Sequence, residues 1–205
     1  ELKRGPKLAD TPLPTALVPN GVIPTMELAE SLLRTGELVA EHGLSAPPEA
    51  PGAPDLGAAR ALLLRTPPGS VPGAFLIGVG EIPLEAAVRL APALAGRVLP
   101  IQGPPGSGKT YTGAHMIVRL AMAGQRVGVV ANSHKVNGNL LDKVDEVAHE
   151  LLGKGEIDRL VRIGQKPRTD HRPTCRGAVP LADNAAVAGA LRGGMVDVVG
   201  AVAWT

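Results

Sequence analysis

Aromatic residues are almost absent from this chain of 205 residues, which has one Phe, one Tyr and one Trp. A hydrophobic core must therefore be built from Leu, Val, Ile and Ala. Cys175 is the single cysteine, which excludes an internal disulfide bond and favours a cytoplasmic location. The sequence contains no run of about 18 apolar residues and no signal peptide, so we expect a soluble protein without a membrane partner.

The net charge of +2 is too small to indicate nucleic-acid binding by the surface as a whole, so any such binding needs a local patch. Proline and glycine, in contrast, are frequent, at 20 and 26 residues. Prolines recur through residues 1–24, and proline-rich breaks follow at 45–54 and 66–73. We expect residues 1–73 to form a proline-rich accessory arm. Its two short helices are predicted at 26–42, capped by Thr25, and at 55–65, capped by Asp55.

The character of the sequence changes near residue 74, after which short apolar segments alternate with amphipathic ones. Strands that alternate with helices are typical of an α/β fold in which helices flank a parallel sheet and ligands bind at the carboxyl ends of its strands. We predict one domain over 74–205, with strands at 75–79, 97–102, 126–131, 160–163 and 196–202 and helices at 83–94, 109–123 and 182–191. A further long helix is predicted after Ser133, with an apolar stripe of Val136, Leu140, Val144, Val147 and Leu151.

One segment of this domain matches the phosphate-loop pattern G-x-x-x-x-G-K-[ST] at every required position. It consists of Gly103, Pro104, Pro105, Gly106, Ser107, Gly108, Lys109 and Thr110. The glycines let backbone N–H groups converge on phosphate oxygens, while Lys109 reaches the β and γ phosphates. Thr110, at the start of a helix, can ligate Mg²⁺ beside the positive end of the helix dipole. Tyr111 is a further candidate for nucleotide contact, with packing on the flank of the helix as the alternative.

A phosphate loop by itself indicates only a nucleotide-binding P-loop protein, so the flanking sequence must select the family. Val98–Val144 resembles motifs I and Ia of superfamily 1B helicases, the group of the nonsense-mediated-decay RNA helicase and the Okazaki-fragment nuclease-helicase. Residues 131–141 and 197–204 are most similar to bacterial members in which the helicase follows a RecB-like nuclease domain. The resemblance implies part of a RecA-like ATPase domain that uses ATP and Mg²⁺ to move along single-stranded DNA, with RNA as the alternative. It further implies a second RecA-like domain and a RecB-like nuclease domain as partners.

The same resemblance assigns a second group of residues to nucleic-acid contact. Asn132, Ser133, His134 and Lys135 correspond to motif Ia, which follows a strand at the carboxyl edge of the sheet. Hydroxyl, amide and backbone N–H donors at such a helix start can hold a nucleic-acid phosphate without reading the base sequence. Ser133 is in either case a helix cap, and a solvated first turn is the alternative for His134 and Lys135.

Two departures from the helicase pattern affect the expected activity. Leu84 stands where many superfamily 1 helicases have a Gln that reads adenine, so adenine selectivity is not implied. No apolar strand of the chain ends in Asp-Glu, the acid pair that completes the Mg²⁺ site and orients water, and we expect it beyond Thr205. We therefore interpret the chain as the N-terminal part of a helicase ATPase domain that hydrolyses ATP very little by itself. The alternatives are another P-loop ATPase or nucleotide kinase, and a non-catalytic nucleotide-binding module.

Two weaker candidates precede the last predicted helix. Lys154–Arg176 contains seven Lys and Arg residues and three acids, a balance that suits a nucleic-acid flank. It has no aromatic residues for stacking on bases, which favours a solvated loop instead. His171 and Cys175 are four residues apart, a spacing compatible with metal ligation, but two ligands are too few to predict a zinc site.

Overall fold

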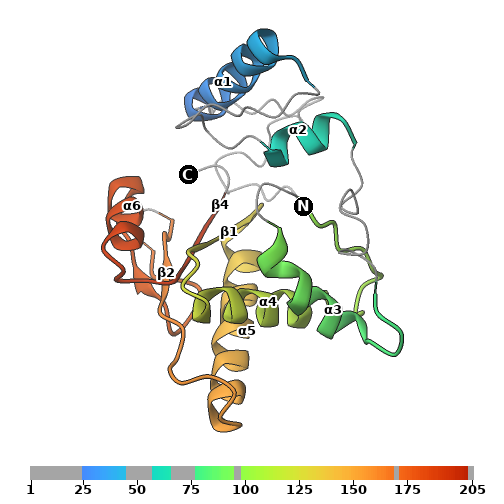
Figure 1. Ribbon diagram of the computed structural model, residues 1–205. Helices are drawn as coiled ribbons and strands as arrows, with labels where there is room; N and C mark the ends of the chain where they lie inside the picture. The colour runs from blue at the N-terminus through green and yellow to red at the C-terminus, as the bar shows by residue number, and fades with distance from the viewer. Residues whose placement is uncertain (1–24, 45–56, 66–76, 95–97, 169–170, 203–205) are drawn as a thin grey trace, which may run out of the picture.

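The computed structural model describes residues 25–44, 57–65, 77–94, 98–168 and 171–202 (Figure 1). Its centre is a four-stranded sheet in the order β1-β4-β2-β3, in which neighbouring strands are parallel. The strands are β1 (Val127–Ala131), β2 (Ile163–Gln165), β3 (Val179–Pro180) and β4 (Val198–Val202). The predicted α/β fold with a parallel sheet is therefore confirmed. The predicted extended segments at 1–24, 45–54 and 66–73 and the Asp55 cap lie outside the described residues.

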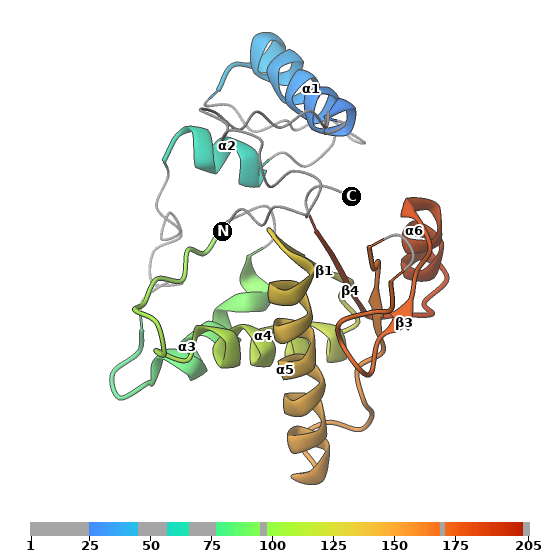
Figure 2. The ribbon, with the colours of Figure 1, turned by 180° about the vertical axis from the view of Figure 1, so that it is seen from behind.

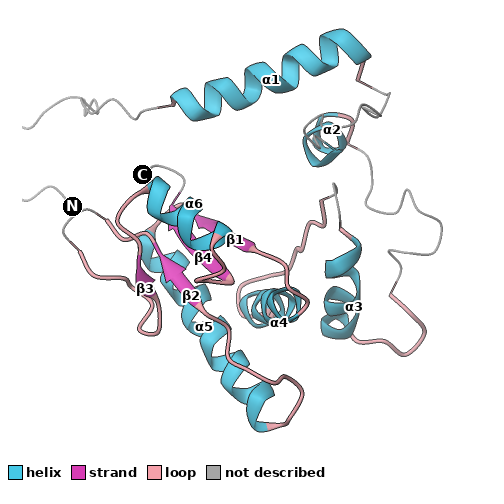
Figure 3. Cartoon of the chain, turned by 60° about the vertical axis from the view of Figure 1, so that its left-hand side comes forward, coloured by secondary structure: helices cyan, strands magenta, loops and turns pink. Residues whose placement is uncertain are grey.

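Helices cover both faces of this sheet, as Figure 3 shows. On one face lies α5 (His134–Gly153) with α4 (Lys109–Met122) beside it, and on the other lies α6 (Asn184–Arg192), while α3 (Pro83–Leu90) packs against α4. On one face α4 and α5 pack against each other and enclose the main apolar core, which includes Leu141 and Val198. On the other face α6 packs over a smaller core that includes Val199. Val198 and Val199 are consecutive in β4 and serve opposite cores, as expected for a parallel strand that is buried on both sides.

Side-chain caps fix where α5 and α6 begin. Ser133 Oγ accepts a hydrogen bond from the Val136 N–H at 3.3 Å, so the predicted cap of α5 is confirmed. Asp183 Oδ1 accepts from the Ala186 N–H at 2.7 Å and caps α6 in the same way. Thr25 makes no side-chain cap hydrogen bond at the start of α1 (Met26–His42), so that predicted cap is wrong.

Among the described residues, hydrogen bonds hold the first two helices of the chain together. α1 has the predicted bounds, and none of its residues is buried. Figure 2 shows α1 and α2 (Gly57–Leu63) next to each other, away from the helices that cover the sheet. Arg60 is the buried residue of α2, and its guanidinium donates to the Leu44 carbonyl oxygen, at 3.0 Å from Nε and 2.6 Å from Nη2. This contact ties α2 to the end of α1.

Two predicted strands are wrong where the structure describes them, because residues 77–79 and 98–102 contain no strand. In place of the first predicted strand, Glu81 closes a turn. Its carboxylate accepts from the Gly78 N–H at 2.7 Å, and its own N–H donates to the Gly78 carbonyl oxygen at 3.0 Å. In the second predicted strand, residues 98–102, Pro100 has no N–H to donate to a neighbouring strand, and three of the five residues are exposed. The phosphate loop is thus entered from a segment outside the sheet.

Other elements differ from their predicted bounds by a few residues. After α3 the chain continues as a 3-10 helix, η2 (Ala91–Ala93), because Pro92 lacks the N–H that an α-helix needs there. β2 begins at Ile163, three residues later than predicted, and the short strand β3 was not predicted. In α5, Val136 is 58 % exposed and Leu141 is fully buried, so the predicted apolar stripe is wrong at Val136.

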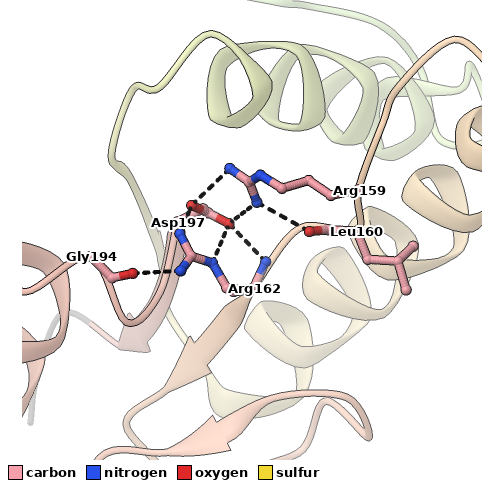
Figure 4. Close-up of polar contacts among 5 residues, drawn as sticks. All are labelled: Arg159, Leu160, Arg162, Gly194 and Asp197. Carbon is pink, nitrogen blue, oxygen red and sulfur yellow. Dashed lines mark hydrogen bonds and ion pairs between the residues drawn. The ribbon is translucent and has the colours of Figure 1, made fainter.

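Asp197 holds the amino ends of β2 and β4 together (Figure 4). Its carboxylate accepts hydrogen bonds from Arg162 N at 2.9 Å, Arg162 Nη2 at 2.7 Å and Arg159 Nη1 at 2.7 Å. Arg162 Nη1 also donates to the Gly194 carbonyl oxygen at 2.6 Å, and this bond ties the turn after α6 to the same cluster. Burial acts to raise the pKa of Asp197, but the bonds from Arg162 and Arg159 outweigh it and hold the pKa well below its usual range. This cluster stabilises the edge of the sheet opposite to the carboxyl ends of the strands.

Candidate phosphate-binding site

The phosphate loop lies directly before α4 and is open to solvent, with residues 104–110 all exposed. Gly108, with φ +81°, is the N-cap of α4, and no side chain caps this helix start. Gly106 has the same φ of +81°, so both positions need a backbone conformation that glycine adopts without strain. The uncapped N-terminus of α4, with the positive end of its dipole, is therefore available to an anion.

Lys109 links the first turn of α4 back to the start of the loop. Its Nζ donates to the carbonyl oxygens of Gly103 at 2.6 Å and Pro104 at 2.8 Å. Gly103 lies so close to Ser107 that a Cβ at position 103 would collide with the serine side chain. The loop is therefore a tight ring that brings an ammonium group to the N-terminus of a helix. These residues fit a phosphate group, since both features are donors with positive charge.

Thr110 and Tyr111 follow in the first turn of α4 but have different surroundings. Thr110 is exposed beside the loop, and its hydroxyl is a suitable oxygen ligand for Mg²⁺. The Tyr111 ring packs edge-on against His115 of the same helix, with ring centroids 4.5 Å apart. The Tyr111 ring therefore lies along the flank of α4.

His115 is buried beside Tyr111, and its Nε2 atom has no hydrogen-bond partner in the described part of the chain. Burial lowers the pKa of His115; Glu150 opposes this effect, and Arg119 adds to it. At neutral pH the ring is therefore uncharged, and it packs edge-on against Tyr111 within α4. The spacing of four residues between the two rings was the sequence pattern that could have indicated this contact.

The turn 132–135 follows β1 at the carboxyl edge of the sheet and leads into α5. Asn132, Ser133 and Lys135 are exposed, and His134 is half-buried. The His134 carbonyl oxygen accepts a hydrogen bond from the Thr174 hydroxyl at 2.9 Å. The exposed side chains of this turn are available to a ligand at the start of α5.

The phosphate loop and the turn 132–135 belong to two helices that meet near their starts. Gly113 of α4 lies against Leu140 of α5, since a Cβ at position 113 would be 4.0 Å from the Leu140 Cδ1 atom. The loop runs into the first two residues of α4, and the turn includes the first two residues of α5. The helices that carry the two groups of predicted site residues therefore pack against each other at Gly113 and Leu140.

A buried polar network joins α5 to the sheet, and the sequence patterns did not reveal it. Asn137 donates from Nδ2 to the carbonyl oxygens of Val129 in β1 at 2.9 Å and of Ala201 in β4 at 3.0 Å. Gln165 in β2 donates from Nε2 to Asn137 Oδ1 at 3.1 Å. Both amide side chains are fully buried. Two sequence features could have indicated this network: an amide residue on the apolar side of a predicted helix, and another at the end of an apolar strand.

The order of elements around this site, with a phosphate loop between α3 and α4, suits a nucleotide-binding domain. Residues 85–179 match the family model of an AAA domain. The matched residues run from α3 into β3, so the phosphate loop and the turn 132–135 both lie within the match, and α6 and β4 follow it. The match selects no subfamily. Comparisons with curated proteins and with solved structures gave no significant match.

A metal site at Cys175 is not supported. Cys175 is 1 % exposed, and burial raises the pKa of its thiol to about 11, so the thiol stays protonated and is a poor metal ligand. Among the described residues, no group of three His, Cys, Asp or Glu side chains is placed to hold a metal ion. The described helices also include none that is long and apolar enough to cross a membrane.

The basic stretch 154–176 is only partly available for binding. Its first four basic residues are paired: Lys154 with Glu150, Arg159 and Arg162 with Asp197, and Lys166 with Asn184. The last three, Arg168, Arg172 and Arg176, are exposed. These three exposed arginines follow β2 at the carboxyl edge of the sheet.

Proposed function

We propose that this chain is the ATP-binding part of an ATP-dependent superfamily 1 helicase or translocase that acts on single-stranded DNA, with RNA as the alternative strand. The observation that carries the proposal is the tight phosphate loop, in which Lys109 and the uncapped start of α4 lie together within an AAA domain. The resemblance of residues 131–141 to motif Ia supports a helicase over other P-loop proteins.

Each part of the loop has a role in this proposal. Backbone N–H groups of residues 107–110 would hold the phosphates of ATP, and Lys109 would turn from the Gly103 carbonyl oxygen to the β and γ phosphates. The Thr110 hydroxyl contributes one ligand to Mg²⁺, an ion that neutralises phosphate charge when bound. Leu84 offers no polar group on α3 to read a base, so we expect little selection of adenine over guanine.

The turn 132–135 is the proposed contact with the strand. Asn132 and Ser133 supply polar side chains, Lys135 supplies charge, and the first turn of α5 supplies N–H groups. Such contacts hold phosphate groups in a fixed position without reading bases. The small net charge of +2 agrees with a local contact of this kind.

In the intact protein we propose a second RecA-like domain that closes over ATP, and a RecB-like nuclease domain as a further partner. ATP hydrolysis would change the relative position of the two RecA-like domains and step them along the strand. Because the Asp-Glu pair that orients water is not found at the end of an apolar strand in this chain, the chain alone should bind ATP and hydrolyse it very little. A cytoplasmic location is part of the same proposal.

The decisive experiment measures ATP hydrolysis by the intact protein with and without single-stranded oligothymidylate. A helicase motor is expected to hydrolyse ATP several times faster when the strand is present. A rate that does not respond to the strand would favour another P-loop ATPase or a nucleotide kinase. ATP binding without hydrolysis by the intact protein would favour a non-catalytic nucleotide-binding module.

A further inference from the structure

We propose that the segment 171–177 forms the second half of a surface for single-stranded nucleic acid, beside the turn 132–135. The ligand is the phosphate backbone of the strand, which Arg172 and Arg176 contact together with Lys135. The inference rests on the proposed function, because it extends the contact surface of the same site.

Thr174 joins the segment to the turn. Its hydroxyl donates to the His134 carbonyl oxygen at 2.9 Å and accepts from Gln165 Nε2 at 2.8 Å. This close approach depends on a glycine at position 138 of α5, because a Cβ there would overlap the Thr174 side chain. The segment 171–177 therefore lies directly on the first turns of α5.

Gln165 fixes the same segment to the sheet. Its Oε1 accepts hydrogen bonds from the N–H groups of Thr174 at 2.8 Å and Cys175 at 3.0 Å. Its Nε2 also donates to Asn137, the residue that bridges the carbonyl oxygens of β1 and β4. Because buried amides with all these bonds hold a single geometry, one network positions both the turn and the segment on the carboxyl edge of the sheet.

The exposed charges of this surface suit a phosphate backbone. Arg172 and Arg176 are exposed on either side of Thr174, and in the described part of the chain neither side chain forms an ion pair. The nearby Asp142 carboxylate accepts a hydrogen bond from the Arg176 backbone N–H at 3.1 Å. Lys135 is exposed on the adjoining turn. Since the segment has no aromatic residue to stack on bases, its contacts go to phosphates.

The first test removes the two charges of the segment. Arg172→Ala with Arg176→Ala should bind a fluorescein-labelled oligothymidylate about tenfold more weakly. The slope of log affinity against log salt should fall by about 1.4, since each phosphate contact on a single strand contributes about 0.7. Arg126→Ala with Arg192→Ala removes two exposed arginines next to the amino edge of the sheet and should leave the affinity within about twofold. Equal losses in the two double variants would overturn the proposal.

The second test removes the hydroxyl that docks the segment. Thr174→Val keeps the shape of the side chain and should weaken strand binding at least about threefold, while Thr174→Ser should restore it. Thr35→Val, which removes a hydroxyl bond of 2.9 Å to the Ser31 carbonyl oxygen in α1, is the matched control. Thr174→Ala removes the same hydroxyl and leaves a smaller side chain. Its strand affinity is measured instead if the valine variant does not fold. Wild-type affinity in Thr174→Val, or no recovery in Thr174→Ser, would refute a positioning role.

The proposed function and this inference fail in different ways. If the unchanged chain does not bind the oligonucleotide, the strand contact of the proposed function is wrong. If Ser133→Ala with Lys135→Ala weakens binding and Arg172→Ala with Arg176→Ala does not, the second half of the surface alone is refuted. Affinity for a fluorescent ATP analogue is measured for every variant and should stay within about twofold, because these residues lie outside the phosphate loop.

Discussion

The Nζ atom of Lys109 lies 2.6 Å from the carbonyl oxygen of Gly103, six residues earlier in the chain. A phosphate oxygen is a stronger partner for an ammonium group than a neutral carbonyl, because a hydrogen bond between charged groups is about twice as strong. ATP binding should therefore draw Lys109 away from Gly103 and open the ring of the loop. The position of this lysine leads to the first prediction.

Lys109→Ala should weaken ATP binding about tenfold to a hundredfold, or roughly 1.4–2.8 kcal/mol. The fold should be retained, because residue 109 is exposed. Titration with a fluorescent ATP analogue checks this, with Lys143→Ala, which removes a lysine paired with Glu146 on α5, as the control. In the intact protein the same variant should lose ATP-driven unwinding and still bind the strand. Substantial unwinding by Lys109→Ala would contradict the motor assignment.

Ser133→Ala combined with Lys135→Ala should weaken oligothymidylate binding and leave ATP affinity unchanged, because the turn is separate from the phosphate loop. The serine change also removes the cap of α5, which costs about 1 kcal/mol of stability. Asp183→Ala is the control for this loss of stability. It removes the corresponding cap of α6, in which Asp183 accepts a hydrogen bond of 2.7 Å from the Ala186 N–H. Fluorescence anisotropy should show weaker strand binding for the double variant than for the control. Equal strand affinity would contradict the assignment of this turn to strand contact.

Local patterns predicted the features that neighbouring residues determine. The bounds of α1 are as predicted, and Ser133 caps α5 through a bond to Val136, three residues further on. Gly106 and Gly108 both have the positive φ that the phosphate-loop pattern requires. Each of these features is formed within one or two turns of the chain, so the sequence is sufficient to reveal it.

Features that depend on distant residues could not be predicted in this way. Residues 98–102 are apolar enough for a buried strand, yet they stay outside the sheet, where Pro100 disfavours pairing. Gln165 ends a short apolar strand, and its partners Asn137 and Thr174 are 28 and 9 residues away. Only the fold brings these side chains together, so the network that positions the turn 132–135 is visible in the structure alone.

Asp197→Asn should destabilise the fold by about 1–3 kcal/mol, because an amide cannot replace the charged hydrogen bonds to Arg159 and Arg162. The expected loss is kept small because the two arginine side chains are 42 % and 52 % exposed. The lowered pKa of Asp197 means that its contribution is present above about pH 4 and is lost as the pH falls through the folded-state pKa. Urea unfolding at pH 7 and pH 3 should show the difference from wild type shrinking in acid. A constant difference would contradict this account.

His115→Phe should make stability less dependent on pH below about 6.5. Burial lowers the pKa of His115 in the folded protein, whereas the unfolded chain takes up the proton near the ordinary value of 6.5. Acid therefore favours the unfolded wild-type chain, and phenylalanine removes this effect while it keeps a ring against Tyr111. Urea unfolding at pH 7.5 and pH 5.5 should show a larger loss of stability for wild type than for the variant. The same loss in both proteins would show that His115 titrates alike in the folded and unfolded states.

Gly200→Ala should destabilise the protein by about 1–3 kcal/mol. A Cβ at position 200 would overlap the side chains of Asn137 and Leu141, where β4 meets α5. Displacing Asn137 breaks its bonds to both strands, so binding of oligothymidylate at the turn 132–135 should weaken as well. Gly128→Ala is the matched control in β1, because nothing lies within 4 Å of its Cβ, and it should change stability by less than about 0.5 kcal/mol. Equal urea midpoints for the two variants would mean that the approach of α5 to β4 does not depend on glycine at position 200.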